Sequence, residues 1–283
     1  MKRILITGKN SYIGNSFSDW IEGDNNFYVE KVSLRDDSWK KMNFSGFDVV
    51  LHVAGIAHVS SDPKMEGSYY KVNRDLTIEV AKKAKKEGVK QFIFMSSIIV
   101  YGNTDKIKGV ISSDTLPKPS NGYGESKLQA EEGLRELQAS HFDVAILRLP
   151  MIYGKESKGN YPRLSKLARV TPIFPNFSNK RSMLHIDNLC EFIKLLVANN
   201  EKGLFFPQNE EYVCTSEMVV LIANNSGKKL RLTRSFNPVI RKLMKLELIN
   251  KVFGNLVYEK KMSIYKDKYQ IRNLEESIKL TEN

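Results

Sequence analysis

The residues best suited to proton transfer are Tyr123 and Lys127, which lie four positions apart in the stretch Tyr-Gly-Glu-Ser-Lys. Residues four apart share one face of an α-helix, so the spacing predicts that both side chains point to one site. A phenol exchanges protons poorly at neutral pH unless its pKa is changed. A neighbouring ammonium favours the phenolate and lowers that pKa. The pair therefore indicates a general acid or base acting on a hydroxyl or ketone oxygen.

A Tyr-x-x-x-Lys pair is common by chance, so the prediction depends on what surrounds it. Ser97 comes just after the apolar segment Gln91–Met95, which is predicted to be a buried strand. A serine hydroxyl at a strand end can hydrogen-bond a reacting oxygen and orient it. We therefore predict that Ser97, Tyr123 and Lys127 form one catalytic group, in which Ser97 and Tyr123 also contact the substrate.

A glycine-rich turn at residues 7–14 separates the first predicted strand from the first predicted helix. Gly8 allows a tight turn, and Gly14 allows the helix to pack closely on the strand. The helix then offers free N–H groups and the positive end of its dipole to a pyrophosphate. A common dinucleotide fingerprint has a glycine where Ser11 stands. The turn still predicts a dinucleotide-binding site.

The end of the second predicted strand carries the residues that distinguish NAD from NADP. An acidic residue at this place typically binds the adenine ribose. Here Arg35 and Ser33, with Lys9 nearby, suit a 2′-phosphate, whereas Asp36 suits the ribose hydroxyls. We favour NADP as the cofactor and keep NAD as the alternative.

Short apolar strands alternate with amphipathic helices through the first half of the chain. This pattern indicates an α/β fold with a Rossmann-type, doubly wound parallel sheet. Its ligand crevice lies at the carboxyl ends of the strands, where all of these motifs fall. The predicted strands are Ile4–Thr7, Tyr28–Leu34, Asp48–Val53, Gln91–Met95 and Asp143–Leu149, and the predicted helices are Ile13–Glu22, Gly67–Glu87 and Tyr123–Ser140.

The pattern loosens after Met151, where prolines interrupt it, and this change predicts a smaller, discontinuous C-terminal substrate lobe that closes over the crevice. Met183–Ala198 is predicted to be a short strand and a helix that return to the main sheet. Cys214–Asn224 and Val239–Lys251 are predicted to be helical. The expected dinucleotide-binding domain is 1–150 plus about 183–200, and the expected substrate lobe is about 151–182 and 201–283.

Composition narrows the class of protein. The chain has 283 residues, of which 41% are apolar, so it can bury a core without disulfides. Its two cysteines, Cys190 and Cys214, are expected to be reduced. No segment approaches the roughly 20 apolar residues that span a bilayer, and we expect a cytoplasmic protein. The net charge of +12 suits anionic partners, but no basic groove with interleaved aromatic residues indicates nucleic acid.

Two further features have alternative interpretations. The basic, amphipathic stretch Pro238–Lys251 could lie on an anionic membrane or pack its apolar face on the substrate lobe. We favour packing and expect no membrane association. The four histidines, His52, His58, His141 and His185, match no common metal-site spacing, so we predict no metal site.

The ordered set of motifs resembles the extended short-chain dehydrogenase/reductase family, in its NAD(P)-dependent sugar-nucleotide epimerase/dehydratase branch. The resemblance covers roughly the first 190 residues. It rests on the turn at 7–14, His52–Gly55, Asn73, Ser96–Gly102, Tyr123–Lys127, Leu147–Gly154 and Arg181–Asp187.

The resemblance implies a role for each matching position. For the cofactor, it implies a pyrophosphate turn, an adenine contact, a groove lined by backbone, and a flank for the nicotinamide. For the substrate, it implies a contact next to that flank and an arginine on the nucleotide diphosphate. The pyrophosphate turn would be formed by Gly8, Ser11, Tyr12, Ile13 and Gly14, and the adenine contacts would be Asn43 and Phe44. Ala54 and Gly55 would line the groove, and Pro150 would flank the nicotinamide. The substrate contact next to that flank would be Met151, and the arginine would be Arg181. Lys127 would also hold the nicotinamide ribose.

Positions that differ from the family pattern limit which of the family's reactions this chain is expected to catalyse. Dehydratases of this branch carry an acidic pair where this chain has Ile98 and Ile99, which argues against water elimination. Met151 replaces the asparagine of galactose-type epimerases. Met151 and Arg35 together favour a 4-keto reductase that acts on a UDP- or dTDP-sugar. A 4-epimerase is the alternative.

The resemblance also implies a setting and an assembly. It implies surface polysaccharide biosynthesis, and a homodimer formed through helices within 68–87 and 126–138. A competing class is a non-catalytic dinucleotide-binding redox sensor, but such a sensor has no need of Ser97, Tyr123 and Lys127.

Overall fold

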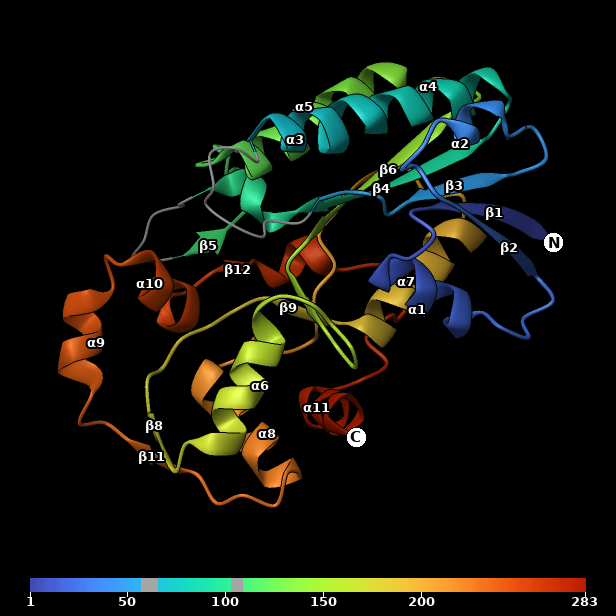
Figure 1. Cartoon of the computed structure of the whole chain (residues 1–283). Coiled ribbons are helices and arrows are strands. Elements are labelled where there is room, and N and C mark those ends of the chain that lie inside the picture. Colours follow the sequence, from blue (N-terminus) through green and yellow to red (C-terminus); the bar gives the residue numbers. More distant parts are fainter. Residues whose placement is uncertain (57–65, 103–108) are drawn as a thin grey trace. The chain divides into compact units, whose positions relative to one another are not determined.

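The computed structural model describes residues 1–56, 66–102 and 109–283, and the chain divides into two compact units (Figure 1). The first unit comprises Met1–Asn103, Leu116–Leu149 and Leu189–Pro207, and the second comprises Thr104–Thr115, Pro150–Asn188 and Gln208–Asn283.

The first unit is built around one sheet. Its strands are β1 (Lys2–Thr7), β2 (Phe27–Val32), β3 (Val49–His52), β4 (Gln91–Ser97), β6 (Asp143–Leu149) and β10 (Gly203–Phe205). Its helices are α1 (Tyr12–Trp20), α2 (Ser38–Lys41), α3 (Glu66–Tyr69), a π-helical stretch at Tyr70–Leu76, α4 (Thr77–Lys86), a 3₁₀ turn at Ile98–Tyr101, α5 (Gly122–Leu137) and most of α7 (Ile186–Ala198).

The six strands run parallel in the order β10-β6-β4-β3-β1-β2. The chain winds outward from β1 in both directions, so the strand order reverses between β1 and β3. Thr7 and His52 are partners at the carboxyl ends of these two strands. A doubly wound sheet opens its ligand crevice at such a reversal, and the segments that follow Thr7 and His52 both begin there.

Helices cover both faces of this sheet. Figure 1 shows α4 and α5 side by side over one face, and α1 and α7 against the other. Ile4, Leu5 and Ile6 are all fully buried, which explains why β1 is continuously apolar instead of alternating. On the α4–α5 face, Leu5 belongs to a core cluster that also contains Val80 and Leu134.

The predicted α/β class and Rossmann-type parallel sheet are confirmed. Three short segments lie elsewhere than expected. Met183–His185, which was expected to return to the main sheet, forms β9 and pairs with β7 (Met151–Tyr153) of the second unit. Gly203–Phe205 joins the main sheet as β10, beside β6, although the sequence placed it in the substrate lobe. Val110–Ile111, which was expected in the first domain, instead forms β5 and pairs with β12 of the second unit. Strands of two or three residues carry too little periodicity to be seen in a sequence.

The second unit consists of short strands and helices around its own core. Its strands are β5 (Val110–Ile111), β7 (Met151–Tyr153), β8 (Ile173–Pro175), β9 (Met183–His185), β11 (Arg231–Thr233) and β12 (Val257–Tyr258). Its helices are α6 (Asn160–Val170), α8 (Thr215–Asn225), α9 (Asn237–Leu243), α10 (Glu247–Phe253), a 3₁₀ turn at Lys260–Ser263 and α11 (Leu274–Glu282). The strands form three parallel pairs: β5 with β12, β7 with β9, and β8 with β11.

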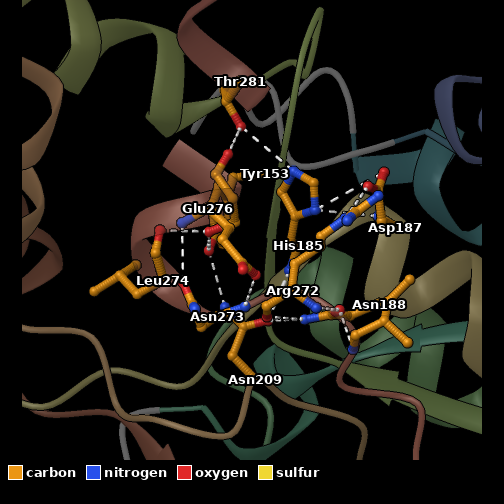
Figure 2. Close-up of polar contacts among 12 residues, drawn as sticks. Tyr153, His185, Asp187, Asn188, Asn209, Arg272, Asn273, Leu274, Glu276 and Thr281 are labelled. Carbon is orange, nitrogen blue, oxygen red and sulfur yellow. Dashed lines mark hydrogen bonds and ion pairs between the residues drawn. The ribbon is translucent and has the colours of Figure 1, made fainter. Parts of the chain in front are cut away.

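A buried polar network holds the C-terminal part of the second unit in place (Figure 2). Asn209 is at its centre. Its side-chain amide donates to the Tyr153 hydroxyl at 2.9 Å, and its oxygen accepts from the His185 backbone N–H at 3.0 Å and from the Asn188 side chain at 2.9 Å. Tyr153 in turn hydrogen-bonds Ser277 of α11 at 2.7 Å. The network therefore joins α11 to β7 and β9.

Asn188 extends this network to the segment before α11. Its side chain donates to the Arg272 carbonyl at 3.0 Å and accepts from the backbone N–H groups of Ile271 and Arg272, both at 2.9 Å. Arg272 also donates to Asp187 at 3.0 Å. Because Asn188 and Asn209 are almost completely buried, each lost bond would leave a partner without water to replace it.

We expect Asn209→Ala to destabilise the protein by about 3 kcal/mol, because it removes three buried side-chain hydrogen bonds. Urea unfolding followed by circular dichroism measures the change. Asn225→Ala is the control, since Asn225 is exposed and bonds only within α8. Equal unfolding midpoints for the two variants would contradict this assignment.

Candidate functional site

The glycine-rich turn has the geometry expected of a nucleotide-binding turn. Ser11 caps α1, and its hydroxyl accepts from the Gly14 N–H at 3.1 Å. Gly8 has φ of +99°, and a Cβ there would lie 3.0 Å from the Ala54 backbone nitrogen. Glycine is therefore required at position 8 both by conformation and by the close approach of the segment after β3.

Gly14 explains how α1 reaches the sheet. A Cβ at this position would lie 2.5 Å from the Ser11 hydroxyl and 2.8 Å from Ile6. The departure at Ser11 also has a physical reason, because its side chain supplies the helix cap that a glycine could not. Tyr12 and Ile13 open α1 between these residues and are partly exposed.

Positive side chains flank the carboxyl end of β2. The backbone of Lys9 donates to the Val32 carbonyl at 3.1 Å, and the side chains of Lys9 and Arg35 are exposed. Asp36 is engaged locally: it accepts from the Ser38 N–H at 2.9 Å, and hydrogen bonds from Ser38 lower the pKa of Asp36. Arg35, more than Asp36, is thus available to a ligand.

The adenine contacts implied for Asn43 and Phe44 stay predictions. Asn43 is exposed, and its side chain accepts from Ser45. The side chain of Phe44 is fully buried in the core beneath the Lys83 ammonium. Its backbone N–H is taken by Glu87 at 2.6 Å.

Ser97 and Tyr123 are brought together as predicted. Ser97 ends β4 and caps the following 3₁₀ turn, and its side chain hydrogen-bonds Tyr123. Asn121 caps α5, so that Tyr123 lies in its first turn. The Tyr69 ring meets the Tyr123 ring edge-on, with 5.7 Å between centroids.

Lys127 is buried one helical turn further along α5. Only 7% of its surface is exposed, its Nζ donates to the Met95 carbonyl at 2.9 Å, and it lies 4.7 Å from the centre of the Phe94 ring. A Cβ on Gly55 would lie 3.4 Å from this Nζ. The exposed backbone at Gly55 therefore passes directly beside the ammonium group.

The electrostatics differ from the expectation that Lys127 lowers the pKa of Tyr123. Burial raises the pKa of Tyr123 to about 12, against the opposing effect of the Ser97 hydrogen bond. Burial lowers the pKa of Lys127 to about 8, against the opposing charge of Glu131. Tyr123 is therefore a protonated phenol at neutral pH in the protein alone.

Asn73 is a site residue that the sequence analysis did not assign to the site. It is fully buried in the π-helical stretch. Its side chain accepts from the Ile56 N–H at 2.8 Å and donates to the Ile56 carbonyl at 3.1 Å. It thereby fixes the segment that carries Gly55. A polar residue next to an apolar helical stripe was the available signal.

Glu131 and Arg148 form a second group that the sequence did not reveal. Arg148 Nη2 meets Glu131 at 2.7 Å, and both side chains are almost completely buried. Ser96 donates to Glu131 at 2.5 Å, and Arg148 donates to the Tyr101 hydroxyl at 2.7 Å. This cluster fixes both sides of Ser97, because Ser96 precedes it and Tyr101 ends the turn that it caps.

The remaining predicted residues belong to the second unit. Pro150 is buried, and Met151 is partly buried in β7, where it pairs with Met183 of β9. The backbone of Arg181 pairs with Val213, and its guanidinium donates to the Gly254 carbonyl at 3.1 Å. The roles of these three residues stay predictions.

His52 and His185 have structural partners. His52 hydrogen-bonds Thr7 at 2.8 Å and Thr77 at 3.0 Å, and His185 belongs to the network of Figure 2. His141 is exposed, and His58 lies outside the described residues. Within residues 1–56, 66–102 and 109–283, no cluster of three potential metal ligands occurs. The same residues contain no helix long and apolar enough to cross a membrane.

Comparison with known proteins identifies the family. Residues 4–213 match the NAD dependent epimerase/dehydratase family, and the chain belongs to this family. The resemblance to the sugar-nucleotide branch of the extended short-chain dehydrogenases/reductases is therefore confirmed.

Two curated relatives and one solved structure describe this similarity. The chain is 30% identical to UDP-glucose 4-epimerase of Vibrio cholerae over 242 residues, which cover 77% of this chain and 74% of the relative. It is 31% identical to N-acetyl-alpha-D-glucosaminyl-diphospho-ditrans,octacis-undecaprenol 4-epimerase of Escherichia coli O157:H7 over 218 residues, which cover 71% and 64%. The human epimerase family protein SDR39U1 with NADPH superimposes with a TM-score of 0.76 over 99% of each chain, at 14% identity.

We expect the buried charge of Lys127 to appear in the pH dependence of stability. Its pKa is lower in the folded state than in the unfolded chain, so the unfolded chain binds more protons between pH 8 and 10.5. Stability linked to this group therefore rises with pH across that window. Relative to Lys127→Met, the parent protein should gain on the order of 3 kcal/mol from the lower to the upper pH.

Urea unfolding of both proteins at a series of pH values measures this difference. Lys82→Met is the control, because Lys82 is an exposed lysine of α4. A stability difference between Lys127→Met and the parent that does not change with pH would contradict the burial of a charged amine.

Proposed function

We propose that this protein carries out NAD(P)-dependent oxidoreductase chemistry at C4 of a nucleotide-diphosphate sugar, as a 4-keto reductase. The observation that supports this proposal most is the hydrogen-bonded pair of Ser97 and Tyr123 next to the buried Lys127. All three side chains come from the end of β4 and the start of α5, at the carboxyl edge of the sheet.

The first unit suits a dinucleotide at this edge. Gly8 and Gly14 leave no room for a Cβ, so the backbone comes close to any ligand lying over the turn. Gly55 is exposed above the Lys127 ammonium, where the amine can hold a ribose hydroxyl. Exposed Arg35 and Lys9 favour a 2′-phosphate, and with it NADP over NAD. When bound, the reduced cofactor supplies hydride.

The protonation state of Tyr123 favours the reductive direction. With a pKa of about 12, the phenol holds its proton at neutral pH and can donate it to a ketone oxygen. Ser97, which hydrogen-bonds Tyr123, can hold the same oxygen in line with that proton. The neighbouring Ile98 is buried and Ile99 packs on Gly124, so neither position offers an acid or base for water elimination.

The second unit supplies the proposed substrate contacts. We assign Arg181 to the diphosphate of the nucleotide, because a guanidinium binds phosphate oxygens through paired hydrogen bonds. Met151 is assigned to the sugar. A homodimer formed through the helices within 68–87 and 126–138 remains part of the proposal.

A 4-epimerase is the second candidate, because two curated relatives that share 30% and 31% identity with this chain are named as 4-epimerases. An epimerase removes hydride and returns it to the opposite face of the sugar. The same Ser97, Tyr123 and Lys127 would serve that reaction, so the difference lies in whether the cofactor is consumed.

We expect the protein to oxidise NADPH with a UDP- or dTDP-linked 4-keto sugar, one NADPH for each ketone reduced. Absorbance at the nicotinamide band, with chromatography of the sugar nucleotide, measures this ratio. NADH in place of NADPH is the matched comparison and should support slower reduction, because it lacks the phosphate that Arg35 is proposed to bind. Conversion of a UDP-sugar to its C4 epimer with no net change in cofactor would favour the epimerase and reject the reductase.

A further inference from the structure

The positive charge of the chain is concentrated in residues 226–251. This segment contains one acidic residue, Glu247, and eight basic residues: Lys228, Lys229, Arg231, Arg234, Arg241, Lys242, Lys245 and Lys251. Its net charge is therefore +7 (eight minus one), more than half of the +12 of the whole chain. The segment includes β11, α9 and α10 of the second unit.

Part of this segment packs as the sequence predicted. Ile240 and Phe253 are buried in the core of the second unit, and Met244, Ile249 and Val252 pack against that core. The expected single helix over Val239–Lys251 is instead two, because Leu246 has an extended backbone between α9 and α10. The two helices follow one another closely in Figure 1.

A second set of apolar side chains on the same helices faces outward. Their exposed fractions are 48% for Phe236, 56% for Val239, 39% for Leu243, 55% for Leu246 and 71% for Leu248. Val239 and Leu243 lie four residues apart and share one face of α9. The break before α10 brings Leu246 and Leu248 to the surface as well. Ile240 and Met244 of this segment belong to or pack on the core, and Val239 and Leu243 lie beside them on α9, where they stay substantially exposed.

Exposed basic side chains alternate with this apolar set along the chain. Arg241, Lys242 and Lys245 are exposed between Val239 and Leu246, and Arg234 is exposed just before Phe236. We call the exposed residues of 234–248 the α9–α10 surface. Apolar side chains that can enter an acyl boundary, with cations at headgroup level, are the composition of an interfacial membrane-binding surface.

The positive charge of the α9–α10 surface favours one class of partner over the others. A second copy of this chain would bring an equally cationic face against this one, which like-charge repulsion opposes. Nucleic acid would complement the charge through its phosphates, but it offers no apolar medium for exposed aliphatic side chains, and four of the five exposed apolar side chains are aliphatic. We propose that the α9–α10 surface docks the protein peripherally on an anionic lipid bilayer. This proposal does not depend on the reaction that the protein catalyses.

Vesicle flotation of the full chain tests the proposal. The protein should bind phosphatidylcholine vesicles that contain phosphatidylglycerol, bind weakly to pure phosphatidylcholine, and be released by salt. The double variant Leu246→Ser/Leu248→Ser removes the apolar contribution, and Lys242→Glu/Lys245→Glu reverses the charge. Each should weaken binding by at least about tenfold.

Matched controls use similar residues elsewhere. Leu116→Ser/Ile264→Ser changes two apolar residues that are 83% and 79% exposed, and Arg163→Glu/Lys166→Glu changes two exposed basic residues of α6. Both controls should retain most of the binding. All the altered positions are exposed, so thermal unfolding should show that each variant stays folded.

Three results would overturn the proposal. The first is no difference between anionic and neutral vesicles. The second is loss of binding in the control variants but not in the α9–α10 variants. The third is a dimer in lipid-free solution, seen by light scattering, that Leu246→Ser/Leu248→Ser dissociates, because a second copy would then be the partner that covers this surface.

Discussion

The burial of one ammonium group organises the first unit. Lys127 is 7% exposed, so it needs compensating partners, which are the Met95 carbonyl and the face of the Phe94 ring. Both belong to β4, and this fixes α5 against the strand whose end carries Ser97. A Cβ on Gly55 would lie only 3.0 Å from Asn73 Oδ1 and 3.4 Å from the amine, so this backbone passes close to both groups. The same contacts that satisfy the charge therefore bring the ends of two strands and one helix to a common place.

The sequence predicted the parts of the fold that repeat a period over several residues. The strands β1 to β4 and β6, and the helices α1, α4 and α5, bury long apolar runs or stripes, and these were anticipated within a few residues. The sequence did not reveal β5 or β10, which consist of two or three residues and exist because a neighbouring strand pairs with them. It also did not reveal the π-helical stretch, whose extra residue is visible only in the hydrogen bonding.

The residues of the candidate site also fall into those that the sequence predicted and those that it did not. Gly8, Gly14, Ser97, Tyr123 and Lys127 could be named because their spacing carries the geometry. The motif position of Phe44 does not show which way its side chain turns, and here it turns into the core. No role was predicted for Asn73, Glu131 or Arg148, because their importance comes from tertiary contacts between distant segments. The raised pKa of Tyr123 in the protein alone was not predicted, since spacing shows a nearby charge but not the cost of burying the phenolate.

The central claim is that Tyr123 gives its proton to the substrate oxygen during hydride transfer. The most direct measurement is a single-turnover reaction of Tyr123→Phe with NADPH and a 4-keto sugar nucleotide, alongside NADPH titration and a Tyr28→Phe control at an exposed tyrosine. We expect Tyr123→Phe to slow hydride transfer by at least about a hundredfold while NADPH affinity and the control stay unchanged. A variant that transfers hydride at the parent rate would show that another group supplies the proton, and would contradict the account.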